Sequence, residues 1–226
     1  MIEAKMDVMR SLQYPARNPG WFKKLVLWVL AMAGVVTVPL AHGYLVRIVR
    51  NVARGNEFLP SFADWKQLYL DGLRVIGALF VLFFPVCLLF ALAALGAGIV
   101  QSQVGDGLQG VLATIAGQLA LRAVQGVYLA CLVVFCPIVY ICVAYSSQWY
   151  AGLNFALMKR LVVGNVVNYV LLILLAYAIV AMSYLGVFFV LVGFIFTLGY
   201  ALMCTAHMYG VYLRSRLLDG ECALAE

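Results

Sequence analysis

The chain has 226 residues, of which 66% are hydrophobic and only 11% are charged. A soluble domain is about 45–50% apolar and about 25% charged, so this composition excludes a water-soluble globular protein. The net charge of +6 does not indicate nucleic-acid binding, because the basic residues flank apolar runs, as they do in membrane proteins. We therefore predict an all-α integral membrane helix bundle that crosses the bilayer several times, with residues 1–226 forming one membrane domain.

The N-terminal segment, residues 1–21, carries several charges and lacks the apolar core of a signal peptide. We expect no cleavable signal and predict a cytoplasmic or interfacial segment. The first apolar run covers residues 22–46 and contains Pro39, which removes a backbone donor and bends a helix. Two topologies stay open: a single crossing, or a re-entrant hairpin that turns back near Pro39. The hairpin keeps the basic residues at both ends on one side of the membrane, so the positive-inside rule favours it.

A polar segment at residues 44–73, which we name the collar, follows this run. Read as a helix, residues 44–55 place Arg47, Arg50 and Arg54 on one face and apolar side chains on the other. This pattern is typical of an amphipathic helix in the membrane interface, where each cation near anionic headgroups contributes about 1 kcal/mol. Gly55 is predicted to end the helix.

A second collar helix is predicted to start at Ser61, which forms a capping-box-like pattern with Asp64. An aromatic face that includes Trp65 would anchor it at headgroup depth. We expect acidic residues near the start of this helix to pair with arginines of the preceding one. A substrate gate built from the same charges is the alternative to a membrane-surface collar. The predicted lipid- or interface-binding residues are Arg47, Arg50, Arg54, Trp65, Lys159 and Arg160.

Four further apolar runs cover residues 75–100, 124–145, 166–183 and 187–211. Each is long enough to be predicted as a membrane-spanning helix. Because only the sequence MSYLG links the last two, we expect them to form a tight antiparallel hairpin. With the first run, the sequence predicts about five transmembrane or re-entrant segments, together with interfacial amphipathic helices.

The basic residues give these runs an orientation. They gather in the N-terminal segment, the collar, the link at 146–165 and the C-terminal tail at 212–226, whereas the links at 101–109 and 183–187 contain none. The positive-inside rule then places the collar, the 146–165 link and the tail in the cytoplasm. We predict a multi-pass protein of the inner (cytoplasmic) membrane with a cytoplasmic C-terminus.

One polar stripe precedes the apolar run at 124–145. Its residues recur at spacings of four, four and three, which places them on one face of a helix. Two interpretations stay open: an interfacial helix whose polar side faces water or headgroups, or a stripe that lines a polar cavity. An arginine buried among membrane helices is costly and usually functional. The stripe consists of Thr114, Gln118, Arg122 and Gln125.

Residue patterns that support catalysis or cofactor binding are scarce. His42 and His207 lie near the ends of apolar runs, and two such histidines can ligate a b-type haem. Structural hydrogen bonds to a neighbouring helix are the favoured interpretation. The apolar runs contain no Asp or Glu, and the sequence has no zinc-protease or phosphate-loop motif. We therefore expect no enzymatic activity, no cofactor and no bound metal.

The order of motifs in the N-terminal third resembles that of a known family. The segments SLQYPARNPGWFKKL and GYLVRIVRNVARGNEFLPSFADWKQLYLDGL look like the bacterial and archaeal membrane family catalogued as domain of unknown function 4013. The rest of the chain resembles the family by pattern, including LNFALMK. The resemblance implies a membrane fold and location but no activity. The matching residues are Tyr14, Pro15, Trp21, Gly43, Tyr44, Arg47, Gly55, Leu59, Pro60, Asp64, Trp65, Asp71, Gly72 and Leu73.

Together these patterns predict a non-catalytic integral membrane scaffold or accessory subunit. Its expected partners are anionic lipid headgroups of the cytoplasmic leaflet and other membrane protein subunits, not nucleic acid. The alternative is a small transporter or lipid-handling membrane protein that uses the polar stripe. A hydrated cavity reaching Arg122 would favour transport, whereas an apolar flank occupied by another subunit would favour a scaffold.

Overall fold

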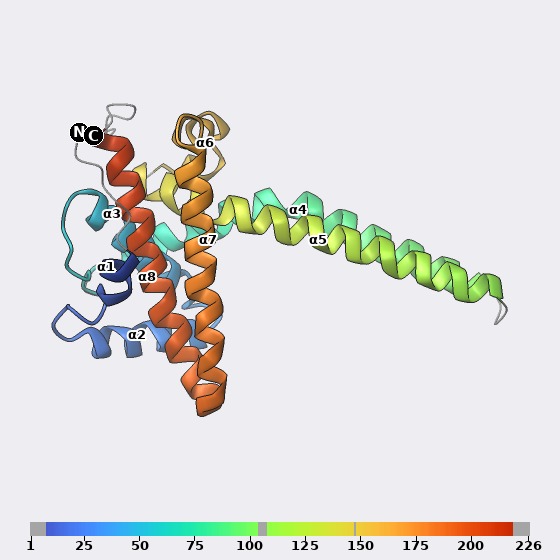
Figure 1. Ribbon diagram of the computed structural model, residues 1–226, viewed down its shortest axis with the longest axis horizontal. Helices are drawn as coiled ribbons and strands as arrows, with labels where there is room; N and C mark the ends of the chain where they lie inside the picture. The colour runs from blue at the N-terminus through green and yellow to red at the C-terminus, as the bar shows by residue number, and fades with distance from the viewer. Residues whose placement is uncertain (1–7, 104–107, 147, 219–226) are drawn as a thin grey trace. The chain divides into compact units, whose positions relative to one another are not determined.

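The computed structural model describes residues 8–103, 108–146 and 148–218 (Figure 1). The first seven residues of the predicted N-terminal segment and the predicted tail beyond Leu218 lie outside this range. Regular structure within the described residues is helical throughout, as predicted. The elements are α1 (Val8–Gln13), α2 (Trp21–Ala33), α3 (Val38–Ala53), α4 (Trp65–Gln103), α5 (Leu108–Tyr145), η1 (Ala151–Leu153), α6 (Phe155–Val162), α7 (Val166–Ser183), η2 (Tyr184–Phe189) and α8 (Val190–Leu218).

The chain divides into two compact units. The larger unit combines Met1–Ala78 with Pro137–Glu226, and the hairpin unit is Leu79–Cys136. Helices α4 and α5 each contribute one end to the larger unit and the remainder to the hairpin unit. That residues 1–226 act as one membrane domain stays a prediction.

Four helices are long and apolar enough to cross a membrane. The qualifying segments are Trp65–Gly96, Thr114–Tyr145, Val166–Val187 and Gly193–Leu218. They correspond to the second to fifth apolar runs of the sequence. The structure thus gives an all-helical protein with four candidate membrane spans, and the interfacial placement of the shorter helices stays a prediction.

The first apolar run forms two helices, α2 and α3, in place of one span. The chain turns at residues 34–37, where the Thr37 hydroxyl donates to the Gly34 carbonyl at 2.8 Å. Pro39 does not cause this turn; it lies in the first turn of α3, where a missing N–H costs little. With 13 and 16 residues, or roughly 20 and 24 Å, α2 and α3 are both shorter than a hydrocarbon core of about 30 Å.

The core of the larger unit lies where α3 packs against α8. The side chains of Ile48 and Val49 on α3 are completely buried. Gly210 of α8 allows this close contact, because a Cβ atom there would lie 2.5 Å from the Val52 side chain. Each large apolar side chain removed from water in this way contributes roughly 1.5–3 kcal/mol.

Helices α7 and α8 form the predicted antiparallel hairpin and lie side by side in Figure 1. Near the connection, the Thr197 hydroxyl donates to the Ser183 carbonyl at 2.9 Å. At the other end, the ring centroids of Tyr169 and Tyr212 are 5.8 Å apart. Contacts at both ends are expected for neighbouring helices joined by a short link.

Two glycines bring α3 and the start of α4 into backbone contact. A Cβ atom on Gly43 would lie 1.7 Å from the Leu68 carbonyl oxygen, and one on Gly72 would lie 1.7 Å from the Pro39 carbonyl oxygen. Side chains larger than hydrogen do not fit between backbones this close. Glycine at both positions therefore allows the close approach of α3 and α4.

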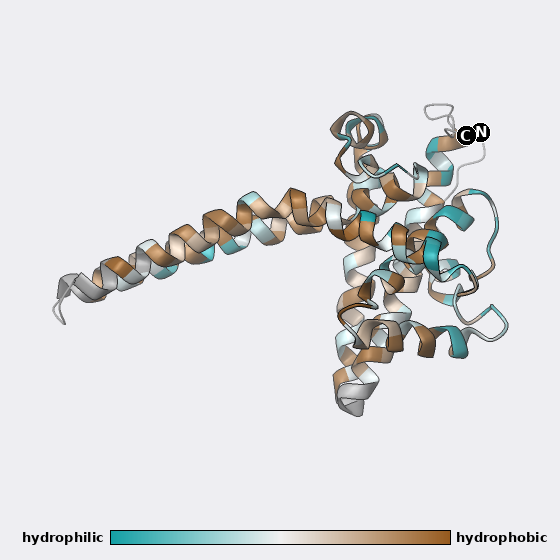
Figure 2. Cartoon of the chain, turned by 180° about the vertical axis from the view of Figure 1, so that it is seen from behind, coloured by the Kyte–Doolittle hydropathy of each residue, from teal (hydrophilic) through white to brown (hydrophobic). Residues whose placement is uncertain are grey.

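The hairpin unit consists of long stretches of α4 and α5 that run antiparallel. The Phe83 and Tyr128 rings pack edge to face across it, with centroids 5.4 Å apart. Hydrophobic residues follow both helices along the hairpin (Figure 2), and many of their side chains are exposed, including Leu92 and Leu119. Helix α5 is continuous from Leu108 to Tyr145, so the polar stripe and the apolar run at 124–145 belong to one helix rather than two.

Candidate functional site

A buried ion cluster joins the collar to the end of α5. The Asp71 carboxylate is fully buried and accepts from Arg50 at 2.9 Å and from Arg74 at 2.6 Å. Arg50 also donates to the Val143 and Ala144 carbonyls, at 3.3 and 3.2 Å, near the C-terminus of α5. A buried carboxylate requires such partners, because an unpaired charge is strongly unfavourable away from water. Sequence reasoning predicted Arg50 as a lipid contact, and the structure gives it a structural role.

A second ion pair joins Arg47 to Asp64 at 3.0 Å. The predicted pairing of collar acids with the arginines of the preceding helix is therefore confirmed. The predicted helix start at Ser61 is wrong: α4 begins at Trp65, and the Asp64 carbonyl accepts from the Leu68 amide at 3.1 Å. Asp64 thus lies at the position that precedes the helix, while its side chain bonds to Arg47.

The other predicted lipid-binding residues are exposed. The Trp65 side chain is 59% exposed, with the Lys66 ammonium 5.8 Å from its ring centroid. Arg54 follows the end of α3, and Lys159 and Arg160 lie on α6; all three are exposed. These residues are accessible to headgroups, and lipid binding by them stays a prediction.

The polar stripe lies on the surface of the hairpin unit. Gln118, Arg122 and Gln125 are exposed and Thr114 is partly buried. The Arg122 guanidinium donates to the Gln125 side-chain oxygen at 3.0 Å. The hairpin unit therefore presents the stripe outward, and a polar cavity lined by it stays a prediction.

Both histidines bond to side chains of neighbouring segments, as the structural interpretation predicted. His42 forms a hydrogen bond with the Tyr140 hydroxyl, and burial lowers the pKa of its imidazole. The Nδ1 atom of His207 is 3.0 Å from the Ser11 hydroxyl. Each interaction joins a helix to a distant part of the chain within the larger unit.

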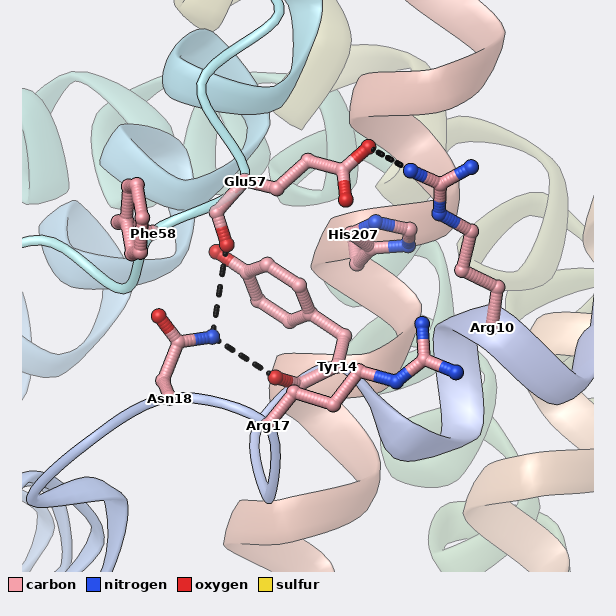
Figure 3. Close-up of a pocket in the computed structure, with 7 residues that line it drawn as sticks. All are labelled: Arg10, Tyr14, Arg17, Asn18, Glu57, Phe58 and His207. Carbon is pink, nitrogen blue, oxygen red and sulfur yellow. Dashed lines mark hydrogen bonds and ion pairs between the residues drawn. The ribbon is translucent and has the colours of Figure 1, made fainter.

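A cavity that sequence reasoning missed lies between the N-terminal segment, the link after α3 and helix α8 (Figure 3). The Tyr14 ring packs against His207, with centroids 4.3 Å apart. Glu57 forms an ion pair with Arg10 across the opening. The sequence signal for this site was the motif SLQYPARNPGW, which was assigned to a cytoplasmic or interfacial segment and to the family resemblance but not to a site.

Asn18 holds the link to the N-terminal segment. Its amide nitrogen donates to the backbone carbonyls of Tyr14 at 2.9 Å and Glu57 at 3.4 Å. Its amide oxygen accepts from the Leu59 amide at 2.8 Å, and Lys24 donates to the Leu59 carbonyl at 2.8 Å. The motif residues therefore fix the backbone that carries Glu57.

Comparison with known proteins gives a family but no activity. The sequence profile of the family described as "Protein of unknown function (DUF4013)" matches residues 26–197, most of the chain. No curated protein and no solved structure matches the chain. The matched range includes the collar, the hairpin unit and α7, and it agrees with the resemblance of the collar motifs. The chain belongs to the DUF4013 family.

Proposed function

We propose that the protein is a non-catalytic integral membrane scaffold or accessory subunit, whose hairpin unit docks another membrane protein. The observation that carries this proposal is the stripe of Gln118, Arg122 and Gln125 on the exposed surface of a largely apolar hairpin. A charged side chain on a lipid-facing helix is costly unless a polar group compensates it. In a scaffold, a helix of the partner supplies that group.

The register of the hairpin supports a deep position for Arg122. Phe83 and Tyr128 are in contact, so residues six positions further along α4 and six positions back along α5 lie at similar depth. These residues are Leu89 and Arg122, and Leu89 is near the centre of the 75–100 apolar run. In a hydrocarbon core of about 30 Å centred on that run, Arg122 is far from either interface.

Charge complementarity indicates the partner's chemistry. An Asp or Glu on a membrane helix at matching depth would neutralise Arg122 and bond to its N–H groups. A second copy of this chain is a poor source, because its apolar runs contain no acidic residue. Asp71 is the nearest acid to those runs, and it is fully buried between Arg50 and Arg74. The expected occupant is therefore a different protein with an acidic membrane helix.

A small transporter or lipid-handling protein is the alternative. It would need the stripe to line a water-filled path across the membrane. We favour the scaffold because the stripe is exposed on the hairpin unit rather than enclosed by it.

The exposed basic and aromatic residues fit a protein anchored at the cytoplasmic leaflet of the inner membrane. Arg54, Trp65, Lys159 and Arg160 are accessible to anionic headgroups. Under the positive-inside rule, these residues and the C-terminus lie on the cytoplasmic side. Arg47 and Arg50 contribute less to lipid binding, because their guanidinium groups are bonded to carboxylates.

Site-specific photocrosslinking in membranes of the native organism tests the scaffold function. A photoreactive amino acid is placed at Gln118 or Gln125 on the stripe, and at Val127 on the opposite side of α5, where the side chain is 59% exposed. We expect protein adducts from the two stripe positions and lipid adducts from position 127. The protein adducts should disappear in Arg122→Leu and persist in Arg122→Lys.

Three results would contradict the proposal. Lipid adducts at all three positions would mean that the stripe has no docked partner. Rapid reaction of a cysteine at position 118 with a small charged thiol reagent would indicate a hydrated path and support transport. Adducts between two copies of this chain would replace the acidic partner with a homo-oligomer.

A further inference from the structure

A cavity of about 200 Å³ in the larger unit has no role in the proposed docking surface. Arg10 and Tyr14 line it from the N-terminal segment, Glu57 and Phe58 from the link after α3, and His207 from α8 (Figure 3). The space is large enough for several water-sized groups. Three segments that are distant in sequence therefore converge on one opening.

The Tyr14 hydroxyl is the unusual group in this cavity. Tyr14 is only 3% exposed, and its hydroxyl has no hydrogen-bond partner among the described residues. The neighbouring Asn18 amide is already bonded to backbone groups of Tyr14, Glu57 and Leu59. Buried hydroxyls in native structures nearly always have a partner, so a group from outside the chain is expected to provide one.

The charge around the cavity favours an anion. Arg10 and Arg17 line it, and Glu57, its one acidic lining residue, is paired with Arg10. Arg214 is also close, because its guanidinium lies 3.7 Å from the position of a Cβ atom on Gly55. The pKa of Glu57 is lowered by the hydrogen bond from Arg10 and, among weaker causes, by the charge of Arg214. Two arginines therefore line the cavity, and the charge of a third, Arg214, reaches its carboxylate.

We propose that this cavity binds a phosphate group, carried by a lipid headgroup or by a soluble phosphate ester. Phosphate oxygens accept hydrogen bonds from guanidinium N–H groups in paired geometry and from a hydroxyl donor. Arg17 lies at the exposed side of the site, where it hydrogen-bonds Gln13. The Tyr14 hydroxyl stays protonated and able to donate, because burial and the nearby Glu57 charge raise its pKa.

His207 and Ser11 position the tyrosine. The His207 ring packs against the Tyr14 ring, and its Nδ1 atom is bonded to the Ser11 hydroxyl at 3.0 Å. The Tyr14 ring is thereby held with its hydroxyl directed toward the Glu57–Phe58 segment (Figure 3). This arrangement fixes the donor before the ligand arrives, which reduces the entropy cost of binding.

Binding to the purified full chain in detergent tests the proposal. The two probes are inorganic phosphate and dihexanoyl phosphatidic acid, titrated at constant ionic strength. We expect saturable binding that Tyr14→Phe weakens roughly ten-fold, the effect of losing one hydrogen bond to a charged group. Tyr44→Phe is the matched control: Tyr44 is also buried, but its hydroxyl donates to the Pro60 carbonyl at 3.3 Å and does not line the cavity. The Tyr44→Phe variant should bind both probes with the same affinity as the wild type.

The two probes separate the sources of the phosphate. Tighter binding of phosphatidic acid than of inorganic phosphate supports a lipid headgroup, and equal binding supports a soluble phosphate. The absence of saturable binding to either probe, or equal affinities for wild type and Tyr14→Phe, would overturn the proposal. Thermal unfolding without ligand gives a second readout: Tyr14→Phe should leave the midpoint unchanged or higher, whereas Tyr44→Phe should lower it. An equal decrease in both variants would mean that the Tyr14 hydroxyl already has a partner within the chain.

Discussion

The larger unit and the hairpin unit use apolar residues in opposite ways. In α8, which belongs to the larger unit, the most apolar window has a mean hydropathy of 1.3 and is 50% buried. In α4, most of which belongs to the hairpin unit, the corresponding window has a mean hydropathy of 2.9 and is only 17% buried. The more apolar window is therefore the more exposed one. This is the reverse of a water-soluble protein, and it is the pattern of a helix long and apolar enough to cross a membrane.

Polar side chains also differ between the larger unit and the hairpin unit. In the larger unit, the carboxylate of Asp71 is bonded to two arginines, and Asn18 makes three hydrogen bonds to backbone groups. In the hairpin unit, Arg122 bonds to Gln125 on its own helix, and both side chains are exposed. Polar residues in the larger unit thus bond to other segments of that unit, whereas Arg122 and Gln125 of the hairpin unit bond to each other and are exposed.

The largest effect should follow removal of the buried carboxylate. Asp71→Asn leaves Arg50 and Arg74 without a compensating charge in a site where Asp71 is fully buried. Breaking a buried ion pair in this way costs about 3–5 kcal/mol. We expect a large decrease in the thermal unfolding midpoint of the purified protein.

Asp64→Asn is the control for that variant. Its carboxylate also pairs with an arginine, but the Asp64 side chain is 66% exposed. An exposed pair contributes about 0–1 kcal/mol. Equal decreases in the two variants would show that burial does not set the strength of these pairs.

Adding one methyl group should destabilise the larger unit but not the hairpin unit. Gly43→Ala places a Cβ atom 1.7 Å from the Leu68 carbonyl oxygen, so α3 and α4 must move apart. Overpacking of this kind costs about 1–3 kcal/mol. In the hairpin unit, a Cβ atom on Gly126 meets no other described atom within 4 Å, so Gly126→Ala should be neutral or slightly stabilising. A Gly126→Ala variant that unfolds as easily as Gly43→Ala would mean that the hairpin is packed against the chain itself.

Hydropathy and charge predicted much of this fold. The predicted run at 166–183 has the same bounds as α7, the runs at 75–100 and 124–145 lie within α4 and α5, and the run at 187–211 begins in η2 and continues in α8. Long apolar segments have few alternatives to a helix, because backbone polar groups in lipid must be bonded within the segment. The acid–arginine pairs of the collar were also predictable, since opposite charges on adjacent helices attract.

The residues at which helices begin and the chain turns were harder to predict from sequence. Pro39 was assigned to a bend, although a proline is equally compatible with the first turn of a helix, and the structure has it there. Ser61 matched a capping pattern, but Asp64 immediately precedes the helix. In both cases one residue type fits two neighbouring positions, and tertiary contacts choose between them.

The cavity could not be predicted because no periodicity relates its residues. Tyr14, Glu57 and His207 belong to three segments that meet only in the folded larger unit. The sequence marks two of those segments through unusual motifs but does not say that they touch. That the Tyr14 hydroxyl has no hydrogen-bond partner among the described residues can be seen only once its neighbours are known.

A smaller effect is expected where a single side chain holds the link after α3. Asn18→Ala removes three hydrogen bonds to the backbone of residues 14, 57 and 59 at a buried position. Leaving those buried groups unsatisfied should cost about 1–3 kcal/mol. The readout is faster proteolysis of the link together with a lower unfolding midpoint. Asn56→Ala is the matched control, because the Asn56 side-chain oxygen accepts only one exposed hydrogen bond, from the Phe58 amide. Similar decreases in the unfolding midpoint of both variants would show that the Asn18 side chain does not hold the link.

The smallest effect is expected at the exposed rim of the larger unit, where Glu57 pairs with Arg10. The hydrogen bond from Arg10 lowers the pKa of Glu57 below its ordinary value of 4.5. A carboxyl group with a lowered folded-state pKa stabilises the protein above its unfolded-state pKa, and this contribution is lost as the pH falls through the folded-state value. Because the Glu57 side chain is 41% exposed, solvent screening keeps the contribution under about 1 kcal/mol.

Comparing wild type with Glu57→Gln across pH isolates this contribution. Near pH 7 the wild type should unfold at a slightly higher temperature, and the difference should shrink as the pH is lowered from about 5 to about 3. High salt should reduce the difference at pH 7, because exposed charges are screened. A difference that stays constant across this pH range would mean that Glu57 acts through packing rather than charge. The rim of the larger unit would then resemble its buried interior, and the contrast between exposed and buried ion pairs in this unit would fail at Glu57.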